Sequence, residues 1–361
     1  MNAFAKSWKS ATLTLAVGIV LLFGLPMFTD EYTLLQLTIY AVMSILGVSL
    51  GFIWGYGGIL CFGQAAFFGL GSYTYAIAVI NIGDSTVPLL LSIAVPALFA
   101  TLLGYVIFYG RLSDVYMGVI TLTVTLILFN LINSTAGPEW KIGSAALGGF
   151  NGIPAIPTLN VPGQSDNLLS SKELFYVTFV CLLGVYLGLR VLISSKIGRV
   201  IIAAKENEQR VLLLGYDARA YKLFCFTLGG AIAGLAGCLF ANWGAFTSPT
   251  IFGLAQSAQI IIWVIVGGLG TLVGPVVGCV AIQWLTTQIG TQQTFNSNLV
   301  LGAILVAFVL LVPRGIVPSF ISIGDWLLRR RGKTVVGAVV AAQNAPHQPD
   351  AAKSNISEQA A

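Results

Sequence analysis

Charge is what this chain has least of. Only 9% of its 361 residues are Asp, Glu, Lys or Arg, against roughly 25% in an average soluble domain. Hydrophobic residues make up 57% of the chain, and the mean hydropathy is +0.89. A soluble globule of this size must cover itself with polar surface, and this composition cannot supply that surface. The chain is therefore predicted to be an integral membrane protein, which excludes a disulfide scaffold, a disordered chain and an ordinary cytosolic enzyme.

Chemically reactive residues are also scarce. The single histidine, His347, lies in a polar tail, so a His-based zinc site or a Ser-His-Asp triad has almost no material. No stretch matches GxxxxGK[ST], which argues against ATP binding by that route. We expect no enzyme activity, no metal and no cofactor in this chain. None of the five cysteines forms a CxxC pair, and all are expected to be small buried residues: Cys61, Cys181, Cys225, Cys238 and Cys279.

Long charge-free stretches predict the membrane spans. The longest runs from Leu223 to Pro313 and has room for several helices of about 20 residues. The sequence predicts an all-α, polytopic transmembrane helix bundle of about 8–10 spans with broken, glycine-rich segments. The first span follows Lys6 and Lys9 as in a signal peptide, but its apolar run favours a retained helix. Ten spans are proposed at 11–28, 33–53, 58–80, 87–109, 116–134, 173–193, 221–242, 253–272, 275–290 and 297–313.

The positions of the basic residues predict the orientation. With the N-terminus inside, 16 of the 18 Lys and Arg residues lie on the cytoplasmic side, and only Lys141 and Lys172 lie outside. The basic excess is thus a topology signal, and no nucleic-acid partner is expected. We predict a transmembrane domain over residues 1–320, with an outside loop at 135–172 and an inside loop at 194–221. Both termini are expected inside, and the tail 321–361 is expected to be disordered.

Glycines cluster in the predicted spans. Small residues four apart allow helices to approach closely, which is the role predicted for Gly230, Gly234, Gly270, Gly274 and Gly278. The stretch Gly55–Gly71 holds six glycines and a polar Gln64, which would weaken an ordinary helix. Broken backbone at membrane depth is tolerated where it is buried or lines a cavity. We therefore predict a kinked segment near a translocation path, rather than merely a flexible entry to the third helix, lined by Gly55, Tyr56, Gly57, Gly63, Gln64, Gly69 and Gly71.

The inside loop is predicted to form one short helix over 196–215. Glu206 and Arg210 stand in the favourable i, i+4 order, and Gly215 is placed to end the helix in the left-handed conformation. The run 211–214 adds an apolar patch beside the charged face. Such a helix suits docking into a groove of another protein; the alternative is a connector lying against the membrane face.

Four ordered motifs resemble those of one family. They are GYGG with FGQAAFFGLGSY in 55–73, GRVIIAAKENEQRVLLLGY at 198–216, IVGGLGTLVGP at 265–275 and GGFNGIP at 148–154. Together they resemble the branched-chain amino acid ABC permeases of the LivM type over about residues 35–320. That family also includes urea and short-chain amide permeases.

The resemblance implies a permease subunit of a binding-protein-dependent importer in a bacterial inner membrane. Its partners would be a second homologous permease, two cytoplasmic subunits that bind ATP and Mg²⁺, a periplasmic substrate-binding protein and membrane lipid. It further implies that the ATPase-coupling residues are Ala203, Ala204, Lys205, Glu206, Glu208, Arg210, Leu214 and Gly215.

Two other function classes stay open on the sequence alone. A urea or short-chain amide permease is an alternative within the family, and a stand-alone channel for a small neutral solute is an alternative outside it. Carriers driven by H⁺ or Na⁺ usually keep intramembrane carboxylates, and the predicted spans contain none except Glu173 at the very start of one of them. An amino acid zwitterion would instead meet helix ends and polar side chains such as Gln64, Asn130 and Gln256.

Overall fold

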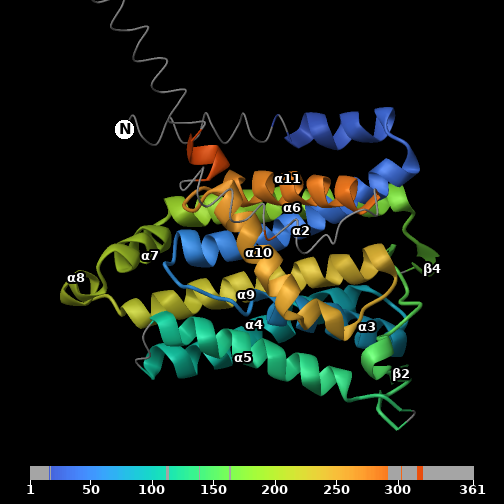
Figure 1. The fold of residues 1–361 in the computed structure, drawn as a ribbon, viewed down its shortest axis with the longest axis horizontal. Coiled ribbons are helices and arrows are strands. Elements are labelled where there is room, and N and C mark those ends of the chain that lie inside the picture. The colour runs from blue at the N-terminus through green and yellow to red at the C-terminus, as the bar shows by residue number, and fades with distance from the viewer. Residues whose placement is uncertain are drawn as a thin grey trace, which may run out of the picture. The chain divides into compact units, whose positions relative to one another are not determined.

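The fold is described from a computed structural model (Figure 1). It describes residues 16, 18–110, 114–137, 139–161, 164–291, 302 and 315–319. The chain divides into two units, Met1–Val317 and Pro318–Ala361, and the description below concerns the first unit alone. All of the predicted tail 321–361, and all of the predicted tenth span 297–313 except Gly302, lie outside the described residues.

Six helices in the described part of the chain are long and apolar enough to cross a membrane. Each corresponds to one of the predicted spans, so the prediction of an all-α, polytopic bundle is confirmed. They are α2 (Glu31–Gly55), α3 (Gln64–Ile82), α4 (Thr86–Tyr109), α5 (Asp114–Asn133), α6 (Ser171–Ser194) and α9 (Ala218–Gly244).

Three further helices correspond to predicted spans. The predicted eighth and ninth spans correspond to α10 (Leu254–Gly267) and α11 (Val273–Thr291). At 14 residues, α10 is shorter than the roughly 20 residues that a full crossing needs. The predicted first span contains a described helix at Gly18–Phe28; the rest of that span is mostly outside the described residues.

Helix α2 lies at the centre of the described bundle. Within its most apolar window 89% of the residues are buried, against 61% for α3 and α9. The windows of α4, α5 and α6 are only 22–28% buried, so most of their apolar side chains face outward. Such an arrangement suits a membrane, because lipid tails are as apolar as the outward-facing leucine side chains, and contact with lipid avoids the free-energy cost of contact with water. Helix α9 packs against α2, α3 and α4, which makes it the second organising helix.

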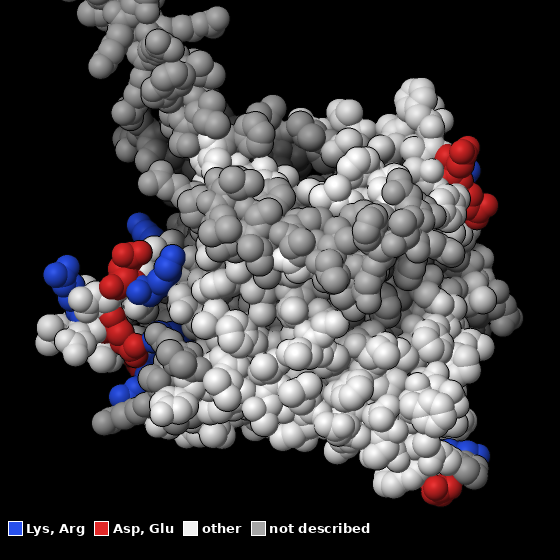
Figure 2. Space-filling model, viewed as in Figure 1, with Lys and Arg blue, Asp and Glu red and all other residues white. Residues whose placement is uncertain are grey.

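Charged side chains gather at two ends of the bundle (Figure 2). One end carries α7 (Lys196–Glu206) and α8 (Glu208–Leu213), which protrude beyond the ends of the long helices in Figure 1. The opposite end carries Asp84, Glu139 and Lys141. The described surface between the two ends is uncharged in this view. An uncharged belt between two charged ends is what a multi-pass membrane protein requires.

The opposite end is closed by two short antiparallel hairpins, which occupy the loop predicted at 135–172. They are β1 (Lys141–Ile142) with β2 (Ala145–Ala146), and β3 (Asn160–Val161) with β4 (Gln164–Leu168), with the 3-10 turn η1 (Gly149–Asn151) between them. Hydrogen bonds fasten the hairpins to the helix ends. Ile153 pairs with Thr247 after α9, and the Ser85 backbone N–H donates to Asn160 Oδ1 at 2.8 Å.

Candidate functional site

A non-helical segment interrupts the chain between α2 and α3. Helix α2 ends at Gly55, and α3 begins only at Gln64. We call residues 56–63 the interrupted segment; it runs back along the bundle in Figure 1. The third span, predicted to be helical from residue 58, therefore starts six residues later than expected. The break is favoured locally because Gly58 adopts φ +70°, a conformation that suits glycine.

The interrupted segment is buried in protein. Ile59 and Cys61 are each only 1% exposed. The Phe62 backbone N–H donates to Thr121 Oγ1 on α5 at 3.2 Å. An added Cβ at Gly63 would overlap the Thr121 backbone, so only glycine allows this approach. Irregular backbone is tolerated in a membrane protein under these conditions, where surrounding helices cover it.

Gln64 ties three helices together at the end of the interrupted segment. Its Nε2 donates to Ser49 Oγ on α2 at 2.7 Å and to the Gly229 carbonyl on α9 at 3.2 Å. Its Oε1 is buried without a hydrogen-bond partner among the described residues. A buried amide oxygen left unpaired costs about 1–3 kcal/mol, so a hydrogen-bond donor that reached this oxygen, such as a water, would be stabilising.

The seven residues predicted to line the path divide into two groups. Gly55, Tyr56, Gly57, Gly63 and Gln64 lie at the interrupted segment or at its ends. Gly69 and Gly71 lie further along α3 and approach neighbouring elements. An added Cβ at Gly69 would overlap the ring of Phe252, which lies in the 3-10 turn η2 (Pro249–Phe252). An added Cβ at Gly71 would overlap the backbone of Gly234 on α9.

Two of the glycines predicted to pack helices together, Gly274 and Gly278, lie where α10 and α11 contact each other. An added Cβ at Gly274 would lie 2.5 Å from the Gly268 carbonyl oxygen, and one at Gly278 would overlap the Trp263 carbonyl. Gly270 differs, because an added Cβ there would meet nothing, but its φ of +85° is one that other residues rarely adopt. Helix α10 ends at Gly267, five residues before the predicted end of the span 253–272, and α11 begins at Val273, two residues before the predicted start of the span 275–290.

Gly230 and Gly234 lie on α9 where it crosses α4. An added Cβ at Gly230 would lie 2.6 Å from Ala100 Cβ, and one at Gly234 would lie 2.7 Å from Pro96 Cγ. The two helices therefore approach more closely than larger side chains would permit.

The protruding segment of α7 and α8 forms two helices rather than the single helix predicted over 196–215. The break is at Asn207, whose backbone is extended at φ −160° and ψ 101°. Its side-chain oxygen accepts the Arg210 backbone N–H at 3.0 Å and so caps α8. Because Glu206 and Arg210 now belong to different helices, the predicted i, i+4 ion pair is wrong. Gly215 adopts φ +84°, as predicted for a helix-terminating glycine.

One side of this segment is held to the bundle. Ala204 and Val211 are buried together with Ala218 at the start of α9. The Lys222 ammonium on α9 lies 2.5 Å from Glu208 Oε2, an ion pair that fixes α8 against α9. Ala204 and Glu208, two of the residues predicted to contact an ATPase, therefore contact this chain's own α9, and the Glu208 side chain stays 38% exposed.

The other side of the segment is an exposed apolar tip. Leu213 is 88% exposed and Leu214 is 74% exposed, beside the exposed Leu212 and Tyr216. We call Leu212–Leu214 the leucine tip. Several adjacent exposed leucines form an apolar patch of the kind that contacts either another protein or the membrane surface. Ala203, Glu206, Arg210 and Gly215, also predicted to contact an ATPase, are exposed on the same segment. Of this tip the motif predicts only Leu214 individually, and Leu213, in the apolar run 211–214, is the more exposed of the two.

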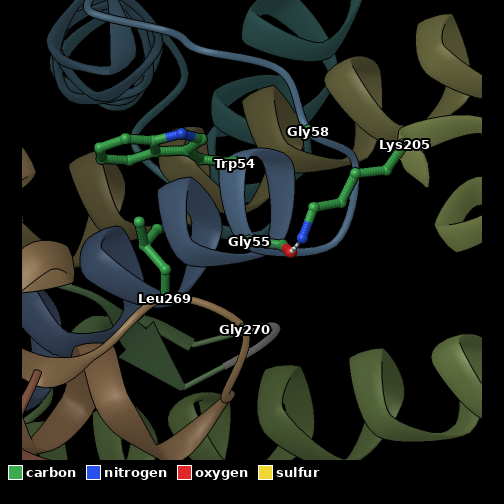
Figure 3. A pocket seen from close by; sticks show the side chains of 6 residues that line it. All are labelled: Trp54, Gly55, Gly58, Lys205, Leu269 and Gly270. Atoms are coloured by element: carbon green, nitrogen blue, oxygen red, sulfur yellow. Dashed lines mark hydrogen bonds between the residues drawn. The ribbon is translucent and has the colours of Figure 1, made fainter. Parts of the chain in front are cut away.

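Lys205, the remaining predicted contact residue, extends toward the interrupted segment. Its ammonium donates a hydrogen bond of 2.9 Å to the Gly55 carbonyl at the end of α2 (Figure 3). A cavity of about 360 Å³ opens here, lined by Trp54, Gly55, Gly58, Lys205, Leu269 and Gly270. This site joins the end of α2, the turn between α10 and α11, and the α7–α8 segment.

The sequence was compared with known protein families and proteins. The model of the family described as "Branched-chain amino acid transport system / permease component" matches residues 32–309. The chain is 29% identical to the high-affinity branched-chain amino acid transport system permease protein LivM of Escherichia coli K12, over 88% of this chain and 77% of that protein. It is 30% identical to LivM of Salmonella typhimurium, over 78% of this chain and 69% of that protein.

A second kind of relative matches over a shorter range. The permease protein LivH of Escherichia coli K12 is 25% identical over 43% of this chain and 51% of that protein. No solved structure matches the chain significantly.

Proposed function

Because the chain belongs to the permease family of branched-chain amino acid transport systems, we propose that it is the membrane-spanning subunit of a binding-protein-dependent ABC importer. The proposed cargo is a branched-chain or related amino acid, moved across a bacterial inner membrane. The observation that carries the proposal is the family match over residues 32–309, which includes the α7–α8 segment and all six long helices except the first residue of α2.

The proposed partners follow from the family and from the exposed surface. LivM and LivH are both permease components of transport systems, and we propose that this chain pairs with a second permease of that kind. Two cytoplasmic ATPase subunits, which would bind ATP and Mg²⁺, are proposed to receive the leucine tip. The structure supports this role because the tip is apolar, exposed and surrounded by charge.

The proposed orientation places the α7–α8 end in the cytoplasm and the hairpin end outside. Within the described residues, the α7–α8 end carries seven basic side chains from Arg190 to Lys222. The positive-inside rule favours this assignment. A substrate-binding protein would then meet the two hairpins, and ATP binding would act on the leucine tip at the other end.

Transport by the reconstituted assembly tests the proposal. The chain, its second permease and the ATPase subunits are placed in liposomes with the binding protein supplied outside, and uptake of labelled leucine, isoleucine and urea is measured with and without ATP. ATP-dependent uptake of a branched-chain amino acid is expected. Uptake of leucine without ATP or ATPases would favour a channel, and ATP-dependent uptake of urea alone would overturn the proposed substrate.

A further inference from the structure

The end of α2 is capped by a residue from the α7–α8 segment. The last four carbonyls of a helix lack partners within the helix and must find them elsewhere. Backbone N–H groups of residues 56–59 satisfy three of them, at Phe52, Ile53 and Trp54, over 3.1–3.2 Å. The fourth, Gly55, accepts from the Lys205 ammonium at 2.9 Å. Lys205 therefore completes the cap from a position 150 residues later in the sequence.

The cap has favourable electrostatics. A helix C-terminus carries a partial negative charge, and a cation placed there stabilises it. In the described part of the chain, the one ion pair is that of Lys222 with Glu208, so no carboxylate there competes with the end of α2 for the Lys205 ammonium. A hydrogen bond to a charged group is stronger than one between neutral groups.

The Lys205 side chain also lies directly on the interrupted segment. An added Cβ at Gly58 would stand 2.7 Å from Lys205 Cγ and 3.2 Å from its Cβ. The absence of a side chain at Gly58 thus makes room for the lysine to pass. On the other side of the cap, an added Cβ at Gly55 would lie 3.0 Å from the Gly270 backbone nitrogen, so the turn between α10 and α11 meets the same point.

Lys205 is close in sequence to the exposed leucine tip. It lies two residues before Asn207, where α7 ends, and α8 carries the tip. The Lys222–Glu208 ion pair and the buried Val211 make α8 a firmly held element. The tip is therefore separated from Lys205 by one short helix and one backbone break.

From these contacts we propose that Lys205 is a positioning residue that transmits movement of the α7–α8 segment to the interrupted segment by holding the end of α2. This inference rests on the proposed function, in which ATPases act on the leucine tip. It differs from the family-based expectation, because it assigns Lys205, although exposed at the surface, to the cap of α2 rather than to contact with an ATPase.

Variants at Lys205 and Gly58 test the proposal in the full assembly in liposomes. The variants are Lys205→Met, Lys205→Arg and Gly58→Ala. Lys196→Met is the matched control, because Lys196 is an exposed lysine at the other end of the same helix. ATP hydrolysis, leucine uptake and ATPase content are measured on each preparation. Lys205→Met and Gly58→Ala should keep the ATPases bound but lower the leucine uptake per ATP hydrolysed. The expected decrease is about tenfold, which corresponds to the free energy of one hydrogen bond to a charged group. Lys205→Arg should restore most of the coupling.

A second readout does not depend on the substrate. Amide hydrogen exchange of the purified full-length chain should show about tenfold faster exchange over residues 56–59 in Lys205→Met, with α9 and the hairpins unchanged. Lys196→Met should exchange like the parent chain. If exchange responds but no amino acid is ever transported, the proposed substrate fails while the cap stands. Unchanged exchange and coupling in Lys205→Met, or loss of bound ATPases in that variant, would overturn the proposed role of Lys205.

Discussion

Replacement of Gly71 by alanine should destabilise the bundle, because α3 and α9 meet there backbone to backbone. An alanine Cβ at position 71 would stand 2.5 Å from Gly234 Cα and 2.7 Å from the Gly234 carbonyl carbon. Carbon atoms prefer a separation of about 3.5–4.0 Å, so the two helices would have to move apart by about 1 Å. The obstacle is backbone, which cannot rotate away as a side chain can.

The expected free-energy change combines two opposing effects. Overpacking of this kind costs about 1–3 kcal/mol, and the upper half of that range applies when the neighbour is rigid. Alanine is favoured over glycine inside a helix by about 0.5–1 kcal/mol, which offsets part of the cost. We therefore expect Gly71→Ala to lower the free energy of unfolding by about 1–2 kcal/mol.

Gly188→Ala on α6 is the matched control. An added Cβ at Gly188 meets nothing within 4 Å, so only the helix preference applies. This variant should be as stable as the parent chain or more stable by up to about 1 kcal/mol. Unfolding of the purified chain by SDS in mixed micelles gives both values. A Gly71→Ala chain that unfolds no earlier than Gly188→Ala would refute the close approach of α3 and α9.

Three further predictions concern the two ends of the bundle. Leu213→Asp should weaken binding of the ATPase subunits by about 10-fold to 100-fold, which corresponds to the free energy of burying one leucine side chain. Gln209→Asp on the same helix should have a smaller effect, and pull-down titrations compare the two variants. Asn207→Ala removes the cap of α8 and should cost about 1 kcal/mol locally, seen as about fivefold faster hydrogen exchange in α8 alone. The Asn160 side-chain amide donates to Asp84 and lowers the pKa of Asp84. The stability that this bond contributes is complete above the ordinary carboxyl pKa and is lost as the pH falls through the lowered pKa of Asp84. Pepsin should therefore cut residues 141–168 faster below about pH 4. Asp84→Asn should make the rate of cutting depend less on pH.

The long helices could be predicted from the sequence because one strong physical rule governs them. A charge inside the membrane is costly, so uncharged stretches bounded by Glu31, Asp84 and Lys172 mark where helices begin or end. The length of the non-helical segment after α2 was harder to predict from the sequence. Glycines at 57, 58 and 63 weaken the helix, but whether a weak helix stays unwound depends on what covers it. Here the cover is α5, through Thr121, which lies about 60 residues away in the sequence.

The α7–α8 segment shows a different limit. The break at Asn207 could have been predicted, since Asn followed by Glu208 is a typical start of a helix. The i, i+4 spacing of Glu206 and Arg210 instead favoured one continuous helix. The direction in which the Lys205 side chain points could not be predicted from the sequence. A lysine on an amphipathic helix can face either solvent or a helix end, and the choice depends on which carbonyl lacks a partner. That carbonyl belongs to Gly55, and it lacks a backbone partner only because the chain after α2 is unwound. The position of this charge is thus a consequence of the break in α2, which is why the two features should fail together when Lys205 is replaced.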